Sequence, residues 1–185
     1  VYPEDSLAAV EDFSVTVPMI EAFAGMFGEY PFIDEKYGMA EFPWAGGMEH
    51  QTLTSYGAAL ITGSHTYDYI NAHELAHQWW GNMVTLGDWR DIWLNEGFAS
   101  YGDALWHEHI SGSSALRDRM ESFRLTYFNE DNTIRYPIYD PPSGYLFGSA
   151  EYEKGAWVLH MLRGVVGDSA FFDILREYRS RHEYG

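Results

Sequence analysis

The sequence predicts an α+β fold in which a small sheet on the N-terminal side precedes a mainly helical body. Strand-like segments, with alternating or β-branched and aromatic residues, end by residue 61, and helical spacing of apolar residues prevails from Tyr67 onward. The chain has 185 residues, 46% of them hydrophobic and 17% aromatic, which is enough to bury one core. Residues 1–185 are therefore expected to form a single domain.

The N-terminal third is expected to contribute one helix and the sheet. Residues 6–30 carry apolar residues at mixed helical spacing and close at Gly28–Pro31, so the second half of this stretch is predicted to be a helix. Residues 36–42 alternate as a strand does, and residues 48–61 have an extended character after a turn at Pro43–Gly47. The two extended segments are expected to pair antiparallel.

The remainder is predicted to be helical, apart from a loop rich in proline and glycine at residues 132–149. The first predicted helix ends near Gly81, and Ser113 or Ser114 is the expected N-cap of the third. The five predicted helices span residues 67–84, 91–110, 113–130, 150–167 and 168–184.

Charge and cysteine content exclude several classes of partner and site. The 28 Asp and Glu against 11 Lys and Arg give a net charge of −17, which repels nucleic acid and anionic lipid surfaces and mildly attracts cationic substrates. The acidic residues are scattered, which favours a solvated surface over an acidic interaction tail. The chain has no cysteine, so any metal must be held by His, Asp or Glu.

No stretch approaches the roughly 20 consecutive apolar residues of a membrane span. The opening VYPEDSLAAV lacks the basic start and apolar core of a secretory signal, although such a signal can be removed from a mature chain. The compartment is therefore left open. The first and last residues suggest a piece cut from a longer chain.

The motif HELAH at residues 73–77 is the strongest candidate for a metal site. Residues four apart lie on one face of a helix, so His73 and His77 can present their imidazoles to one point. Glu74 is then placed to reach a metal-bound water without being a ligand, as in HExxH metallopeptidases. The alternative is a chance match on a core helix, and the pattern alone favours the metal.

A catalytic zinc needs three protein ligands and one open position. Glu96 in WLNEGFASY is the candidate third ligand, because a loop with Gly81 and Gly87 can bring a second helix back against the first. Burying an unpaired carboxylate in so apolar a stretch costs several kcal/mol, and metal coordination removes that cost.

These motifs together resemble a known family. HELAHQWWGN followed by WLNEGFASY, with Glu96 nineteen residues beyond His77, is similar to the zinc aminopeptidases related to aminopeptidase N and the leukotriene hydrolase. GGMEH at residues 46–50 resembles that family's GxMEN exopeptidase motif, and YEKGAWVLHMLR from Tyr152 resembles its tyrosine-bearing segment. The resemblance implies a thermolysin-like catalytic domain with one zinc ion per chain.

The resemblance also implies a role for each matched residue. His73, His77 and Glu96 would be zinc ligands, and Glu74 the general base for a zinc-activated water. Tyr152 would donate a hydrogen bond to the oxyanion of the transition state, although a tyrosine packing the core is the alternative.

Substrate binding is implied for Gly46, Gly47, Met48 and Glu49, with Glu49 on the free α-amine of a peptide and the glycines allowing close backbone approach. His50 stands where the family usually has Asn, which leaves the amine-binding geometry open.

Other polar and aromatic residues have weaker interpretations. Asp103 either accepts a hydrogen bond from a zinc-bound histidine or faces solvent. The remaining residues singled out are expected to be structural or to pack around the site: His107, His109, His160, Trp79, Trp80 and Trp93.

The predicted function is hydrolysis of the N-terminal peptide bond of peptides with a free N-terminus. A thermolysin-like endopeptidase and a zinc-stabilised binding domain with little activity are the alternatives, and GGMEH argues against the first. Members of the resembled family usually carry flanking domains, so such domains of a parent chain are expected partners.

Overall fold

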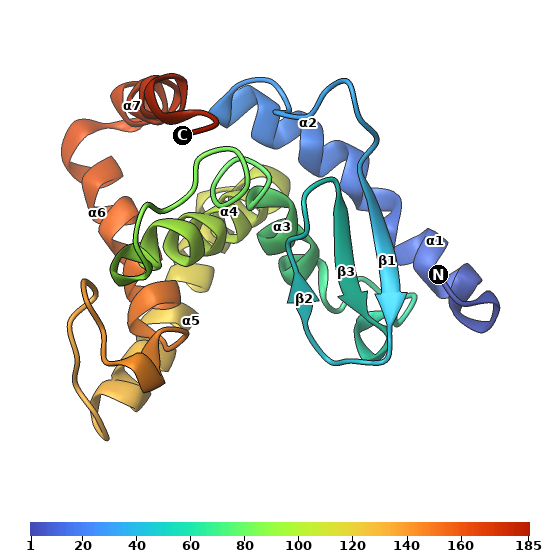
Figure 1. Cartoon of the computed structure of the whole chain (residues 1–185), viewed down its shortest axis with the longest axis horizontal. Coiled ribbons are helices and arrows are strands. Elements are labelled where there is room, and N and C mark those ends of the chain that lie inside the picture. The colour runs from blue at the N-terminus through green and yellow to red at the C-terminus, as the bar shows by residue number, and fades with distance from the viewer.

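The computed structural model describes residues 1–185 and confirms the α+β architecture, with a small sheet beside a body of helices (Figure 1). The sheet has the order β1-β3-β2, formed by Gly38–Phe42 (β1), Gly47–Met48 (β2) and Leu53–Gly57 (β3). Strand β1 pairs parallel with β3, and β2 pairs antiparallel with it. The expected antiparallel pair of the two extended segments is wrong, because β2 reverses the chain between them and occupies the other edge of β3.

The predicted helices are confirmed, with an additional N-terminal helix and an irregular turn. Residues Ala150–Lys154 form a π-helix that continues directly into α6. The α-helices are α1 (Ser6–Asp12), α2 (Thr16–Phe27), α3 (Asp68–Ala76), α4 (Trp93–Ser111), α5 (Ser113–Asp131), α6 (Gly155–Val166) and α7 (Asp168–His182).

Two helix boundaries differ from the prediction. Helix α3 ends at Ala76 and not near Gly81, because the chain folds back: the Asn82 amide donates to the His77 carbonyl at 2.9 Å, and Gly81 has a φ of 139°. Ser113 and Ser114 are not N-caps, since Gly112 at φ 79° turns the chain directly from α4 into α5 and no side chain caps the new helix.

Helix α3 lies between the sheet and α4 (Figure 1) and is the centre of the molecule. Twenty-six buried residues from α2 through α7 and the α3–α4 loop form one apolar cluster around it. Trp79 and Trp80, just after α3, are almost fully buried in this cluster, and the Trp79 indole N–H donates to the Gly28 carbonyl at 2.9 Å. Trp93 packs against the cluster and is partly buried. The predicted packing role of these three tryptophans is confirmed.

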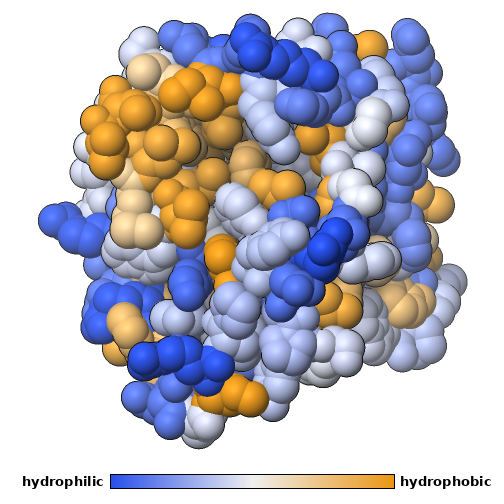
Figure 2. All heavy atoms as spheres, turned by 60° about the vertical axis from the view of Figure 1, so that its left-hand side comes forward, coloured by the Kyte–Doolittle hydropathy of each residue, from blue (hydrophilic) through white to orange (hydrophobic).

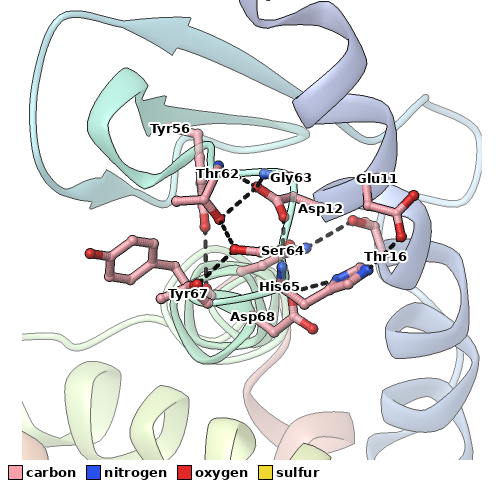
Figure 3. A network of polar contacts seen from close by, with 12 residues as sticks. Glu11, Asp12, Thr16, Tyr56, Thr62, Gly63, Ser64, His65, Tyr67 and Asp68 are labelled. Atoms are coloured by element: carbon pink, nitrogen blue, oxygen red, sulfur yellow. Dashed lines mark hydrogen bonds and ion pairs between the residues drawn. The ribbon is translucent and has the colours of Figure 1, made fainter.

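The loop before α3 is held by one buried carboxylate (Figure 3). Asp12 accepts hydrogen bonds from the backbone amides of Thr62 at 2.6 Å, Gly63 at 2.8 Å and His65 at 2.8 Å. Burial by itself raises the pKa of Asp12, but these donors outweigh burial and lower it. The His65 ring bridges Asp68 at 3.1 Å and Glu11 at 3.4 Å. The start of α3 is thereby tied to α1.

The surface carries one apolar patch (Figure 2). Figure 2 shows apolar side chains gathered on the side where α6 and α7 lie. The exposed apolar residues of these two helices are Met161, Leu162, Val165, Val166 and Ile174. No helix has both the length and the apolar character needed to cross a membrane.

Candidate metal centre and catalytic site

The two histidines of HELAH face one another at the C-terminal end of α3. His73 lies in the last turn, His77 directly follows the helix, and their Nε2 atoms are 3.1 Å apart. His77 is 1% exposed, so its imidazole must find its partners inside the protein. The helical spacing therefore brings the two rings to one point, as the sequence predicted.

The second ring nitrogen of His77 selects the tautomer that its neutral imidazole adopts. Nδ1 lies 2.9 Å from the Trp80 carbonyl oxygen, which can only accept a hydrogen bond. A neutral His77 therefore carries its proton on Nδ1 and directs the lone pair of Nε2 toward His73. Metal-bound histidines commonly have this outer-shell bond to a carbonyl. The early end of α3 is what brings the Trp80 carbonyl into place.

The third predicted ligand comes from α4. Glu96 Oε2 lies 3.3 Å from Nε2 of His73 and 3.3 Å from Nε2 of His77. Ligands at about 2.0–2.1 Å from a tetrahedral zinc are about 3.3 Å from each other, so the three atoms have the spacing of a zinc site. Glu96 is 6% exposed and its Oε2 is buried without a hydrogen bond, which a metal would satisfy.

The electrostatics of this cluster also favour a cation. Burial raises the pKa of Glu96, but His77 and His73 outweigh burial and hold the pKa below its usual range. Burial lowers the pKa of His77, but Glu96, with Glu49 and Glu74, raises it to about 10. The carboxylates thus create a field that holds a positive charge at this point. Glu49, Glu74 and His77 form a second possible ligand set that shares His77.

Glu74 is buried beside His73 and His77 and faces β2. It is 7% exposed, and burial raises its pKa although His73 and His77 lower it. A methyl group on Gly47 would lie 2.3 Å from Oε1 and 2.5 Å from Cδ of Glu74. Only glycine fits there, so the glycine of the GGM segment belongs to the site and is not merely part of a turn.

Tyr152 lies in the π-helix before α6. Its ring stacks on His73 with centroids 5.8 Å apart, and it lines the same cavity as Glu74. Burial, followed by the charge of Glu96, raises its pKa, so the phenol stays protonated. Single-turn π-helices occur frequently at functional sites, and here one places Tyr152 in the cavity that also contains His73, His77 and Glu96.

Glu49 follows β2, and two residues that the sequence analysis did not single out fix its backbone. Asn82 donates from Nδ2 to the Glu49 carbonyl at 2.7 Å. Gln78, which is fully buried, accepts from the Thr52 amide at 2.9 Å. The edge strand is thereby tied to the loop after α3. The sequence offered one indication of this role: Gln78 is an amide side chain within the largely apolar run LAHQWWG.

Two weaker expectations are resolved by the structure. Asp103 neither reaches a ligand histidine nor faces solvent: it is 2% exposed and accepts from Arg119 Nε at 2.8 Å, because α5 packs against this face of α4. Nδ1 of His73 instead lies 3.5 Å from the Ser100 hydroxyl. His50 is exposed, with Nδ1 3.0 Å from the Ser55 hydroxyl, and lies outside the ligand cluster.

Two cavities meet at this cluster. Both are lined by Gly47, His73, Glu74 and Tyr152. One, of about 320 Å³, also contains Glu49, His77, Glu96 and the aromatic residues Trp44, Trp89 and Phe147. The other, of about 250 Å³, extends toward α5. A substrate bound across the shared wall would have one part in each cavity.

Comparison with known proteins identifies a peptidase family. The family model for the peptidase family M1 domain matches residues 11–185. Human aminopeptidase N is 32% identical over 92% of this chain, and human endoplasmic reticulum aminopeptidase 1 is 30% identical over 91%. The chain spans about a fifth of the length of these relatives, 20% in each case.

Solved structures of related proteins have the same fold as this chain. An M1 zinc metallopeptidase from Deinococcus radiodurans, solved with a Tyr-Ser-Ala substrate, superposes with a TM-score of 0.75 at 32% identity, over 91% of this chain and 36% of that one. Yeast LTA4 hydrolase with bestatin has the same fold, with a TM-score of 0.84 at 24% identity, over 93% of this chain and 30% of that one. With its sheet, its histidine pair and its α4 carboxylate arranged as described, the chain belongs to peptidase family M1.

Proposed function

We propose that this chain is the catalytic domain of a zinc-dependent aminopeptidase that hydrolyses the N-terminal bond of peptides. One observation carries the proposal: the ligand atoms of His73, His77 and Glu96 lie 3.1–3.3 Å from one another beside two further carboxylates. Family membership and the names of the relatives support it.

One zinc ion per chain would be held by His73, His77 and Glu96. Three protein ligands leave one coordination position open, which distinguishes a catalytic site from a structural one. Bound there, zinc supplies Lewis-acid polarisation of the scissile carbonyl and lowers the pKa of a coordinated water.

Glu74 is the proposed general base. Its position on α3 between the two histidines, together with a pKa raised by burial, suits a carboxylate that takes a proton from the attacking water. The same carboxyl group then passes this proton to the nitrogen of the leaving amine. Gly47 keeps Glu74 in position, because no larger residue fits against its side chain.

Tyr152 is the proposed oxyanion donor. A phenol with a raised pKa keeps its proton and can donate a hydrogen bond as charge develops on the carbonyl oxygen. Its stacking on His73 fixes the ring at the wall shared by the two cavities.

Glu49 is the proposed anchor for the substrate amine. It shares a cavity with the ligand cluster and carries a negative charge that an internal peptide bond does not match. Gly46, Gly47 and Met48 would hold the substrate main chain along the edge of β2. An endopeptidase has no use for such an anchor, and a structural zinc domain has no use for Glu74 and Tyr152.

Further domains of the parent chain are proposed partners. The relatives are about five times longer than this chain, and the outer face of α6 exposes Met161 and Val165. Packing of another domain against that face would bury these side chains. Binding to nucleic acid is not proposed, because the net charge is −17.

The test is the hydrolysis of an alanine anilide with a free amine and of its N-acetylated twin by zinc-loaded protein. An aminopeptidase cleaves only the free-amine compound, and Glu74→Gln abolishes this cleavage. Glu49→Gln should raise KM more than it lowers kcat, because the amine contact exists before the reaction. Equal cleavage of both compounds would establish the endopeptidase, and cleavage of neither with one bound zinc would establish the binding domain.

A further inference from the structure

The two cavities at the reaction site hold different parts of the substrate if the proposed function is right, and the inference below rests on that function. Glu49, the amine anchor, lines only the cavity on its side of the ligand cluster. The residue that follows the scissile bond must then enter the other cavity, here called the leaving-side cavity. Its volume of about 250 Å³ offers room for one side chain.

The cationic group in the leaving-side cavity, the guanidinium of Arg119, is already paired with a carboxylate of the protein. Arg119 donates from Nε to Asp103 at 2.8 Å, and a second guanidinium nitrogen lies against the same oxygen. The guanidinium also stacks over the rings of Tyr69 at 4.7 Å and Phe123 at 4.6 Å. A buried carboxylate and two aromatic faces thus hold Arg119 in place and compensate its charge. An acidic side chain of a substrate would gain little from it.

The carboxylate of Glu153, in the same cavity, has no cationic side chain paired with it. Glu153 lines the wall and forms no ion pair, because the adjacent Lys154 turns to the hydroxyl of Tyr127 at 3.3 Å. Burial raises the pKa of Glu153 to about 7, and the charges of Arg119 and His73 do not offset this rise. A carboxylate that lacks a cation, at the wall of a cavity open to substrate, would be stabilised by a positive charge supplied by the substrate.

We propose that Glu153 selects peptides with lysine or arginine as the residue immediately after the scissile bond. A long cationic side chain can lay its methylene groups along Ile70 at the cavity wall and bring its charge to Glu153. An acidic side chain would instead meet the negative charges of Glu153 and Glu74. The net charge of −17 adds attraction at longer range for cationic peptides.

The size of the preference follows from the partial burial of the cavity wall. A charge pair that is only partly shielded from water contributes about 1.4 kcal/mol, which corresponds to about a tenfold preference. This interaction forms on binding, so it should appear mainly in KM and less in kcat.

The test compares the dipeptide amides Ala-Lys-NH2, Ala-Gln-NH2 and Ala-Glu-NH2 as substrates of the zinc-loaded protein. We expect kcat/KM for the Lys compound to exceed that for the Gln compound about tenfold, with the Glu compound the poorest. Glu153→Gln should reduce the Lys-to-Gln ratio to within about twofold, and Glu153→Lys should favour the Glu compound. The matched control, Glu121→Gln on the exposed face of α5, should leave the ratio unchanged.

The alanine anilide separates failure of this inference from failure of the proposed function. Its leaving group carries no charge, so its cleavage does not depend on a contact with Glu153. If the anilide is cleaved but the Lys and Gln amides react equally, only the inference is overturned. A preference for Lys that persists in Glu153→Gln would also overturn it. If neither the anilide nor any of the amides is cleaved, both are refuted for this chain.

Discussion

The contact between Gly47 and Glu74 allows a sharp test of the catalytic geometry. In Gly47→Ala, the added methyl carbon would lie 2.3 Å from Oε1, 2.5 Å from Cδ and 2.6 Å from Cγ of Glu74. Ordinary contacts between such atoms are about 3.5–4.0 Å. Either the Glu74 side chain or strand β2 must therefore withdraw by about 1 Å.

The expected loss of activity follows from this displacement. A 1 Å misplacement at a reacting centre costs about 100-fold in rate, and complete removal of a general base costs about 10²–10⁴-fold. We therefore expect kcat/KM of Gly47→Ala to fall about 100-fold, equivalent to about 2.7 kcal/mol of transition-state stabilisation. Zinc binding should persist, because all three proposed ligands come from α3, its C-terminal cap and α4 and not from β2.

The assay is hydrolysis of the free-amine alanine anilide, with zinc content and thermal unfolding measured on the same sample. Gly164→Ala on α6 is the matched control, because its added methyl group meets no atom within 4 Å. If Gly47→Ala keeps its activity within threefold of the parent while Glu74→Gln is inactive, the close contact does not position the base, and the reasoning is refuted.

Four further results are expected from other parts of the fold. Asp12→Ala should lower the free energy of unfolding by about 3–5 kcal/mol in urea denaturation, because three backbone N–H groups lose a charged acceptor. The difference in unfolding free energy between Asp12→Ala and the parent should become smaller as the pH falls below about 4. Folding lowers the pKa of Asp12, so its carboxylate stabilises the fold above the unfolded pKa, and this stabilisation is lost when the carboxylate is protonated. Gly97→Ala should cost about 1–3 kcal/mol in calorimetry, because its methyl group would lie 2.7 Å from Cα of Gly155, whereas Gly25→Ala, in open space, should not destabilise. Removal of zinc by a chelator should lower Tm, because it leaves the buried Glu96 oxygen without a cation.

The juxtaposition of His73, His77 and Glu96 could be predicted from the sequence because short-range geometry determines most of it. Helical spacing fixes how His73 and His77 face one another, and an apolar stretch around Glu96 indicates a buried carboxylate that needs a cation. The early end of α3 was not predicted. It depends on Gly81, whose positive φ lets the Trp80 carbonyl meet His77.

Other features depend on packing between distant segments and leave no local pattern. The strand order β1-β3-β2 depends on β2, which has only two residues and is too short to show an alternating pattern. The parallel pairing of β1 with β3 was therefore predicted as antiparallel. The partner of Asp103 is Arg119, which α5 brings from sixteen residues away. The proposed role of Glu153 could not be predicted from the sequence, because it depends on the cavity that the folded chain forms around this residue.

The origin of each group suggests how the chemistry can vary while the metal centre stays the same. The proposed zinc ligands are held by the two central helices, in the most buried part of the core. The proposed substrate contacts come from the edge strand β2 and from the π-helix, which border the cavities. Changes in β2 or the π-helix can therefore alter rate and selectivity without unfolding the metal site. Substitution of Glu49 or Glu153 should accordingly change which peptides are cleaved and leave zinc stoichiometry at one per chain, whereas Glu96→Gln should lower both zinc content and Tm.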